Sequence, residues 1–279
     1  MLQGEIQIHI HIINITNSKI IVQLRQNSRK KGKGIFTTTL KWVNYNIPGE
    51  IMKVIVPIGG GEISSKTTLK IDKYIVSLVN KETKKVLFIP TASGDMASYI
   101  EKFKDYYQSL GCEVDCLLLS QTDNDNLIRS KIFSSDIIYI GGGNTARMMR
   151  IFKRCKVNEY LTLAYERGII LTGLSAGAMA YFTNGYSDSN RSTNPEASLC
   201  LVKCLNLIPY CFCPHYNEEE RKSFDEFVNN KNFNGLALDD DVALVVIDEK
   251  IKGVIKANEN NNGYYINNLS KKIIQEIGE

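Results

Sequence analysis

Short apolar runs alternate with amphipathic stretches through most of this 279-residue chain. Strands alternating with helices favour a parallel sheet, because each crossover helix packs on one face of it. Helical patterns cover, for example, residues 96–110 and 157–167. We therefore predict an α/β fold with a mostly parallel sheet and helices on both faces. The predicted strands are residues 53–58, 85–90, 113–119, 136–140 and 168–172.

The loops after these strands carry glycines and hydroxyl residues. Ligands of parallel sheets bind beyond the carboxyl ends of the strands. We therefore expect residues 59–61, 91–93, 141–143 and Ser175 on one rim of the sheet.

The end of the chain has another pattern. Residues 242–247 and 251–255 are predicted as a hairpin that closes through a charged turn. Residues 258–263 are rich in asparagine, and we expect a polar loop there.

The first 51 residues fit the alternation of strand and helix poorly. Residues 6–15 alternate like a strand, with His9 and His11 on one side. Residues 25–34 are basic and polar, which predicts a loop. The start lacks the basic and apolar segments of a secretory signal, so none is expected.

The regular pattern begins at Met52. We predict a single α/β domain over residues 52–279 and an N-terminal extension over residues 1–51. Gly49 and Glu50 can be encoded by a purine-rich stretch like a ribosome-binding site, which favours Met52 as the native start. A disordered segment, a basic tail or an added strand are the other interpretations of the extension.

A glycine-flanked serine follows one predicted strand. Residues 173–177 are Gly-Leu-Ser-Ala-Gly, and a helical pattern continues from Ala178. Strand, tight turn and helix are the context of a nucleophile elbow, which exposes a serine hydroxyl at the end of a sheet. Ser175 is therefore the candidate nucleophile. The alternative is a glycine-rich turn needed only for packing.

A serine hydroxyl needs a base to remove its proton, and the usual base is histidine. Of the three histidines, two lie in the N-terminal extension. The third, His215, follows the strand-like residues 211–213 and Pro214, and it precedes the acidic start of a helix at residues 217–221. Because a strand end faces the same rim as Ser175, we predict that His215 is the base rather than a structural residue.

An acidic residue should orient that histidine. Three consecutive aspartates, residues 239–241, separate two apolar strands. Asp188 and the glutamates 218–220 are alternatives, and spacing alone does not choose among them.

A second glycine cluster, residues 141–143, follows another predicted strand. Asn144 or Thr145 then caps a helix, and N–H groups at a helix start attract negative charge. An acyl-transfer enzyme needs such donors where the oxyanion forms. The cluster lacks the lysine of a P-loop and the spacing of a dinucleotide site, so nucleotide binding is disfavoured.

These motifs resemble the dipeptidase E, or aspartyl dipeptidase, family of serine peptidases, which is related to cyanophycinase. The resemblance covers roughly residues 52–256, and the 34-residue step from Gly141 to Ser175 is similar to the spacing in that family. It implies a class I glutamine amidotransferase-like, flavodoxin-like fold. The motifs are Ile-Gly-Gly-Gly-Asn-Thr at residues 140–145, Gly-Leu-Ser-Ala-Gly-Ala at residues 173–178, Pro214-His215 and the strand pair around Asp240.

The resemblance implies roles for single residues. Ser175 matches the nucleophile, His215 the general base, and Asp240 the acidic member of the triad, which is often a glutamate in the family. The backbone N–H groups of Gly143 and Ala176 match the oxyanion hole.

Other positions match less closely. Asp188 lies near an aspartate that has also been proposed as a triad member, so it is the rival acid. Arg221 falls near an arginine that is associated with the acidic side chain of the substrate, and Arg191 is the reserve for this role. Together with Asn144, Arg221 is our candidate for substrate binding.

Composition narrows the setting. The extension carries a charge of +5 and the remaining chain −1, and such a near-neutral body argues against nucleic-acid binding. No apolar run approaches 18 residues, so no membrane span is expected. Seven cysteines without a disulfide framework or zinc spacing suit a reducing cytoplasm, and we expect no metal and no cofactor.

The sequence thus predicts a cytoplasmic serine peptidase for short peptides, with an N-terminal aspartate as the implied preference, acting as a monomer or homodimer. An esterase of the α/β-hydrolase type is one alternative, but its order of serine, acid and histidine would require Asp188. The other is a catalytically silent binding protein of glutaminase-like fold. A glutaminase proper would carry cysteine at position 175.

Overall fold

The computed structural model describes residues 7–16, 19–29, 36–46 and 51–278. It consists of two units, Met1–Met52 and Lys53–Glu279, each of which is described by itself. The boundary lies one residue after the one expected from the sequence.

The first unit contains a three-stranded antiparallel sheet in the order β1-β2-β3. The strand predicted at residues 6–15 corresponds to β1 (Gln7–Thr16), and it pairs with β2 (Lys19–Arg29). β3 (Phe36–Asn46) flanks β2 on its other edge. The loop predicted at residues 25–34 is therefore wrong for residues 25–29, because backbone pairing on both edges keeps this polar stretch extended. Residues 30–35 lie outside the described residues.

The second unit is built around a seven-stranded sheet in the order β14-β13-β4-β8-β7-β5-β6. Five neighbouring strands run parallel, as the alternation of strand and helix predicted. The predicted hairpin is confirmed as β13 and β14, which add antiparallel strands beside β4. The strands are β4 (Val54–Ile58), β5 (Lys84–Ile89), β6 (Cys112–Cys116), β7 (Ile137–Ile140), β8 (Ile170–Leu174), β13 (Val242–Ile247) and β14 (Lys250–Lys256).

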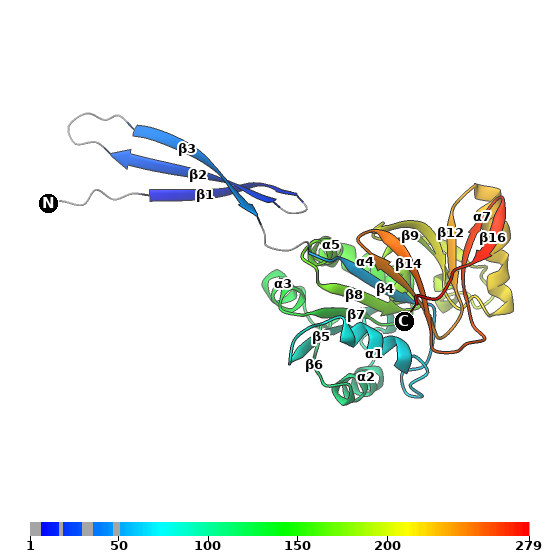
Figure 1. Cartoon of the computed structure of the whole chain (residues 1–279). Helices are drawn as coiled ribbons and strands as arrows, with labels where there is room; N and C mark the ends of the chain where they lie inside the picture. The colour runs from blue at the N-terminus through cyan, green and yellow to red at the C-terminus, as the bar shows by residue number, and fades with distance from the viewer. Residues whose placement is uncertain (1–6, 17–18, 30–35, 47–50, 279) are drawn as a thin grey trace. The chain divides into compact units, whose positions relative to one another are not determined.

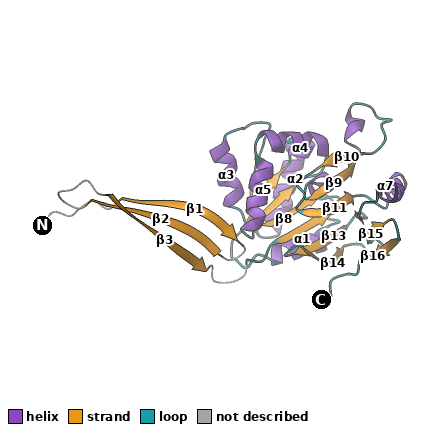
Figure 2. Cartoon of the chain, turned by 90° about the horizontal axis from the view of Figure 1, so that it is seen from above, coloured by secondary structure: helices purple, strands orange, loops and turns teal. Residues whose placement is uncertain are grey.

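Helices cover both faces of this sheet, as Figures 1 and 2 show. Alternate strand residues point to opposite faces, so Val86 and Phe88 pack with α1 and α2 while Leu87 and Ile89 pack with α3 to α6. The helices are α1 (Leu69–Ser77), α2 (Ala97–Ser109), α3 (Asp125–Phe133), α4 (Thr145–Arg154), α5 (Val157–Glu166), α6 (Ala176–Met179) and α7 (Ser223–Lys231).

The unit also holds a second sheet, which the sequence analysis did not predict. Its order is β10-β9-β11-β12-β15-β16, with parallel pairs only at the centre. Its outer strands are partly exposed, so they lack the continuous apolar runs that identify buried parallel strands. The strands are β9 (Phe182–Ser187), β10 (Cys200–Lys203), β11 (Ile208–Cys213), β12 (Gly235–Leu238), β15 (Gly263–Asn267) and β16 (Ser270–Ile273).

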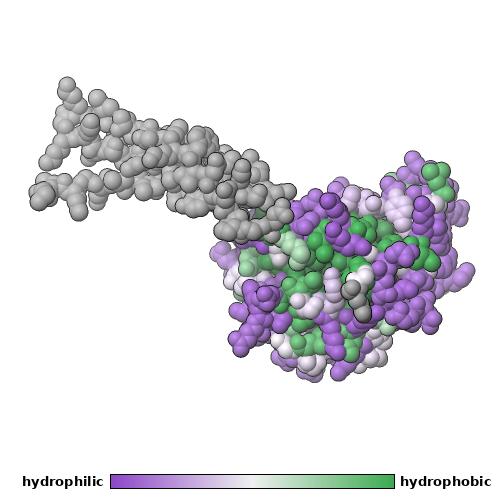
Figure 3. Space-filling view, viewed as in Figure 1, coloured by the Kyte–Doolittle hydropathy of each residue, from purple (hydrophilic) through white to green (hydrophobic). Residues whose placement is uncertain are grey.

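The two sheets share one apolar core. Phe182 and Phe212 stack with ring centroids 4.2 Å apart, and they belong to the same buried cluster as Leu87 of the first sheet. The opposite face of the second sheet packs against Phe224 and Val228 of α7. On the face in view in Figure 3, apolar residues reach the surface near the middle of the unit and polar residues surround them.

Candidate active site

Ser175 stands at the turn between β8 and α6, as the elbow pattern predicted. Its backbone has φ 53° and ψ −107°, a left-handed conformation that an ordinary residue adopts only when the surroundings enforce it. A Cβ on Gly177 would lie 2.0 Å from the carbonyl oxygen of Ile140, and one on Gly173 would lie 2.8 Å from the same oxygen. The two glycines are therefore required for the turn to pack against β7.

His215 follows β11 and Pro214, and it also has a left-handed backbone, with φ 52°. Its N–H donates to the carbonyl of Gly59 over 3.3 Å, which ties this turn to the loop after β4. Nε2 of His215 lies 2.8 Å from Oγ of Ser175. The ring is therefore within hydrogen-bonding reach of the serine hydroxyl proton.

Asp240 completes a hydrogen-bonded line. Its Oδ1 lies 2.7 Å from Nδ1 of His215. Because a carboxylate accepts hydrogen bonds only, Nδ1 carries the proton and Nε2 is left to accept from Ser175. Burial opposes the charge, but hydrogen bonds from His215 and Asn217 outweigh it, and they hold the pKa of Asp240 below its ordinary value.

The other two aspartates of residues 239–241 have different partners. Asp239 is buried and accepts from the backbone N–H of Asn262 over 2.8 Å, and burial raises its pKa. Asp241 accepts from the hydroxyl of Thr67 over 2.5 Å. Each aspartate of this turn therefore makes its own contact, and only Asp240 faces the histidine.

Gly60 lies directly against the side chains of His215 and Asp240. A Cβ there would lie 1.8 Å from Oδ1 of Asp240 and 2.4 Å from Nδ1 of His215. The sequence placed the glycines of residues 59–61 on the rim of the sheet, but it did not indicate that this glycine makes room for the imidazole–carboxylate pair.

The glycine loop after β7 lies beside Ser175. A Cβ on Gly142 would come within 3.7 Å of the Ser175 Cβ. Gly143 has φ 135°, and a Cβ on it would lie 2.3 Å from the carbonyl oxygen of Ala92. Within residues 51–278, the N–H groups of Gly143 and Ala176 donate to no protein acceptor. These are the two donors that the family resemblance implies for an oxyanion hole, and the loop at residues 91–93 supports one of them.

Asn144 is an N-cap rather than an open polar group. Its Oδ1 accepts from the N–H of Arg147 over 2.8 Å, which confirms the predicted start of α4. Its Nδ2 donates to the carbonyl of Ser189 over 2.9 Å and to the hydroxyl of Ser192 over 3.1 Å. Both ends of the amide are therefore engaged with protein, and this disagrees with a role in substrate binding.

Arg221 and Asp188 are paired with each other. The Arg221 side chain is only 4% exposed, and its Nη2 lies 3.1 Å from Oδ2 of Asp188. The same guanidinium donates to Glu218 over 3.3 Å and to the carbonyl of Tyr186 over 3.2 Å. Asp188 bonds Arg221, whereas Asp240 bonds His215, and the guanidinium of Arg221 is engaged by three protein groups. Arg191, the reserve, pairs with Glu220 at 2.7 Å.

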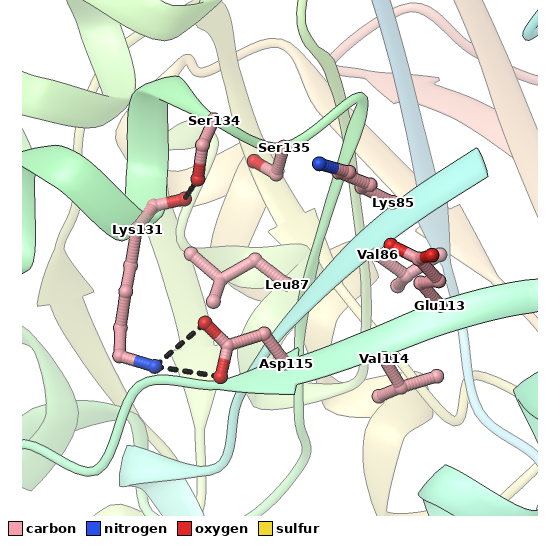
Figure 4. A pocket seen from close by; sticks show the side chains of 9 residues that line it. All are labelled: Lys85, Val86, Leu87, Glu113, Val114, Asp115, Lys131, Ser134 and Ser135. Atoms are coloured by element: carbon pink, nitrogen blue, oxygen red, sulfur yellow. Dashed lines mark hydrogen bonds and ion pairs between the residues drawn. The ribbon is translucent and has the colours of Figure 1, made fainter. Parts of the chain in front are cut away.

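Neither a metal site nor the cavity beside β5 and β6 adds to this arrangement. Among the described residues, no group of three or more His, Cys, Asp or Glu side chains could hold a metal ion. A cavity of about 240 Å³ lies between β5, β6 and the end of α3 (Figure 4). In this cavity Lys131 donates to both carboxylate oxygens of Asp115, at 2.6 Å each. The cavity lies near the amino-terminal half of β5, whereas the loops around Ser175 follow the carboxyl ends of the strands.

The chain is similar in sequence and in fold to known peptidases. The chain is 33% identical over 219 residues to the uncharacterized peptidase YgaJ of Bacillus subtilis, which covers 77% of this chain and 92% of that protein. It is 26% identical over 146 residues to peptidase E of a Nostoc species, across 51% of this chain and 56% of that protein. The crystal structure of a peptidase from an acI-B1 actinobacterium superposes with a TM-score of 0.61 at 16% identity, covering 82% of this chain and 96% of that one, and this likeness shows the fold.

A family model gives the assignment. Residues 55–254 match the model described as peptidase family S51, and this span includes the serine, the histidine and the aspartate described above. The relatives bear peptidase names, and the chain is accordingly a peptidase of the serine type. On this evidence the chain belongs to peptidase family S51.

Proposed function

We propose that Ser175, His215 and Asp240 hydrolyse short peptides through an acyl-enzyme. The observation that carries the proposal is the unbroken line of two hydrogen bonds, 2.8 Å from Ser175 to His215 and 2.7 Å from His215 to Asp240. This is the arrangement that activates a serine for nucleophilic attack.

The proposed reaction has two halves, acylation of Ser175 and hydrolysis of the resulting ester. The Ser175 oxygen attacks the peptide carbonyl carbon while its proton passes to Nε2 of His215. The carbonyl oxygen becomes an oxyanion that accepts hydrogen bonds from the N–H groups of Gly143 and Ala176. The C–N bond then breaks, and the departing amine takes the proton from His215. A water molecule then attacks the carbonyl carbon of the ester while its proton passes to His215. The ester C–O bond breaks, the carboxylic acid leaves, and Ser175 recovers its proton from His215.

The negative charge of Asp240 supports the proton transfer. The imidazole becomes positive when it accepts the Ser175 proton, and the adjacent carboxylate stabilises that charge. Burial would raise the pKa of Asp240, but hydrogen bonds from His215 and Asn217 outweigh it and hold the pKa below its ordinary value, so burial does not neutralise the carboxylate at neutral pH. An esterase with Asp188 as its acid is disfavoured, because that side chain is bonded to Arg221.

We propose an N-terminal aspartate as the preferred first residue of the substrate, from the family resemblance and the relatives named peptidase E. Such a side chain requires a cation near the acyl group. Arg147 is a better candidate than the buried Arg221, because it is exposed and its Nη2 donates to the carbonyl of Ala92 over 2.6 Å, directly beside Gly143. Kinetics on Asp-Leu and Leu-Leu dipeptides test this: Arg147→Met should lose the preference for Asp-Leu, and an unchanged preference would rule Arg147 out.

The central test is covalent labelling. A fluorophosphonate should label the wild-type protein at Ser175, and Ser175→Ala should remain unlabelled and inactive. Loss of the nucleophile or the base typically lowers turnover by about 10⁴–10⁶-fold, so His215→Ala should be similarly inactive. Retention of more than a few per cent of turnover by either variant would refute the assigned pair.

We propose the cytoplasm as the compartment, because all seven cysteines are unpaired in the structure. Among the described residues, no helix has the length and apolar character needed to cross a membrane.

We expect a monomer or a homodimer that binds no nucleic acid, and light scattering after size exclusion tests the assembly. Large apolar side chains exposed within residues 51–278 are Met52, Met96, Leu127, Leu163, Leu269 and Ile273.

A further inference from the structure

Asn217 lies two residues after His215 and contacts Asp240 twice. Its Nδ2 donates to Oδ2 of Asp240 over 3.0 Å, and its Oδ1 accepts from the backbone N–H of Asp240 over 2.9 Å. The other carboxylate oxygen of Asp240, Oδ1, faces the histidine. The two oxygens of Asp240 therefore have separate partners, the base and this asparagine.

The pairing fixes the orientation of the Asn217 amide. The backbone N–H of Asp240 requires an acceptor, so the amide oxygen faces it, and the amide N–H₂ is left to face the carboxylate. The opposite orientation would place two donors together and two acceptors together. The side chain and the main chain of Asp240 are thus held at the same time by one residue of the segment that carries the base.

Asp240 needs such a restraint. Its side chain is 30% exposed, so water competes for its oxygens and would allow other rotamers. It also stands in a turn, directly before Asp241, which has a left-handed backbone with φ 59°. The amide of Asn261 donates to the carbonyl of Asp240 over 2.7 Å, which holds the backbone but leaves the carboxylate free to rotate.

We propose that Asn217 is a positioning residue of the catalytic unit: it holds the Asp240 carboxylate so that Oδ1 receives the Nδ1–H of His215 and Nε2 faces Ser175. This inference rests on the proposed function. Asn217 touches no reacting atom, and it acts through Asp240.

The rate at which a fluorophosphonate labels Ser175 tests the inference without knowledge of the substrate. Asn217→Leu should label roughly 10–100-fold more slowly, the scale expected for loss of a hydrogen bond to a charged group. Because Asn217 is exposed, the melting temperature should stay near that of the wild type. Asn268→Leu is the matched control, since this exposed asparagine bonds only Asn232 among the described residues. It should label at the wild-type rate.

The pH dependence of labelling distinguishes positioning from a merely structural role. Asn217→Asp keeps the size of the side chain but adds a negative charge beside Asp240, which already interacts electrostatically with Asp239, His215 and Arg221. The added charge favours the protonated imidazole, so the acid limb of the labelling rate should move to higher pH. That shift follows from the charge alone, so the neutral Asn217→Leu decides the question. A displaced Asp240 carboxylate stabilises the imidazolium less and moves the acid limb to lower pH, whereas a structural role would slow labelling equally at every pH.

The outcomes separate the two proposals. If the wild-type Ser175 is not labelled, the proposed function fails. If the wild type is labelled and Asn217→Leu labels as fast, or slows equally at every pH, the positioning role is refuted while the proposed function stands. Should the leucine variant melt early, the smaller and equally neutral Asn217→Ala carries the same test.

Discussion

The two sheets of the second unit differ in how deeply they are buried. In the seven-stranded sheet, β4, β7 and β8 are buried along their whole length. In the six-stranded sheet only β12 is buried along its whole length, and no residue of the edge strands β10 and β16 is fully buried. The edge strands β6 and β14 of the seven-stranded sheet are partly exposed, but each keeps at least one buried residue. The deeply buried sheet supplies Ser175 and the glycine loops, and the more exposed sheet supplies His215 at the end of β11.

The candidate site therefore forms where the two sheets meet. Asp240 lies in the turn between β12 of one sheet and β13 of the other. Ser175 and His215 both have left-handed backbones, held by bonds to residues after or within β4. One sheet therefore sets the position of the nucleophile, while the alignment of the base depends on how the second sheet docks against it.

The largest effect in this comparison should come from the residue that joins the sheets. Asp240→Asn should lower kcat by roughly 10³–10⁴-fold, because the amide favours the wrong imidazole tautomer. Asp188→Asn is the matched control and should retain most of the activity, since Asp188 bonds Arg221. A larger loss at Asp188 in steady-state kinetics would transfer the acidic role to it.

Gly60→Ala should displace the base from the nucleophile. The added methyl group would overlap Oδ1 of Asp240, 1.8 Å away, and must push the carboxylate or the imidazole aside. We expect a loss in kcat of about 10²-fold, the scale for a displacement near 1 Å. Gly278→Ala is the control, because a Cβ there meets nothing within 4 Å. Normal turnover by Gly60→Ala would mean that the joint between the sheets tolerates more movement than the structure indicates.

Arg221→Met should weaken the second sheet rather than alter specificity. The guanidinium is almost fully buried and bonds Asp188, Glu218 and the carbonyl of Tyr186. Loss of these bonds should lower the free energy of unfolding by about 1–3 kcal/mol, and activity should fall alike on Asp-Leu and Leu-Leu. Urea titration and dipeptide kinetics measure the two effects. A selective loss on Asp-Leu with unchanged stability would restore Arg221 as the substrate cation.

The charge on Asp240 should make a small pH-dependent contribution to the free energy of unfolding. Its pKa in the folded protein lies below the ordinary value of 3.8, so the ionised form stabilises the fold above about pH 4, and this contribution is lost as pH falls through the folded pKa. The difference in melting temperature between the wild type and Asp240→Asn should therefore shrink as the pH falls below about 4. A difference that is constant from pH 7 to pH 3 would contradict this linkage.

Removal of residues 1–51 should have the smallest effect. Both sheets of the second unit are complete within residues 53–279, and the first unit forms its own sheet. A chain that begins at Met52 should label with fluorophosphonate at the full-length rate and melt at a similar temperature. Insolubility or a large drop in melting temperature would show that the second unit depends on the first.

The sequence alone predicted the apolar strands that are buried on both faces of the sheet. The runs in β4, β5, β7 and β8 are continuous because both faces of these strands are covered by helices. It missed β9, β10, β15 and β16, because these short strands are only partly buried and no continuous apolar run marks them. The polar stretch expected at residues 258–263 is a loop only up to the start of β15 at Gly263.

The sequence also singled out Ser175 and His215, since a glycine-flanked elbow and a single available histidine are local features. It could not choose Asp240 over Asp188 from spacing, because neighbours in the chain do not report which side chain faces the imidazole. Only the tertiary structure decided that choice, by docking the turn after β12 against Gly60 and by pairing Asp188 with Arg221. The physical reason is that strand and turn formation depend on residues near one another in the chain, whereas a hydrogen bond 2.7 Å long between residues 25 apart depends on the packing of two whole sheets.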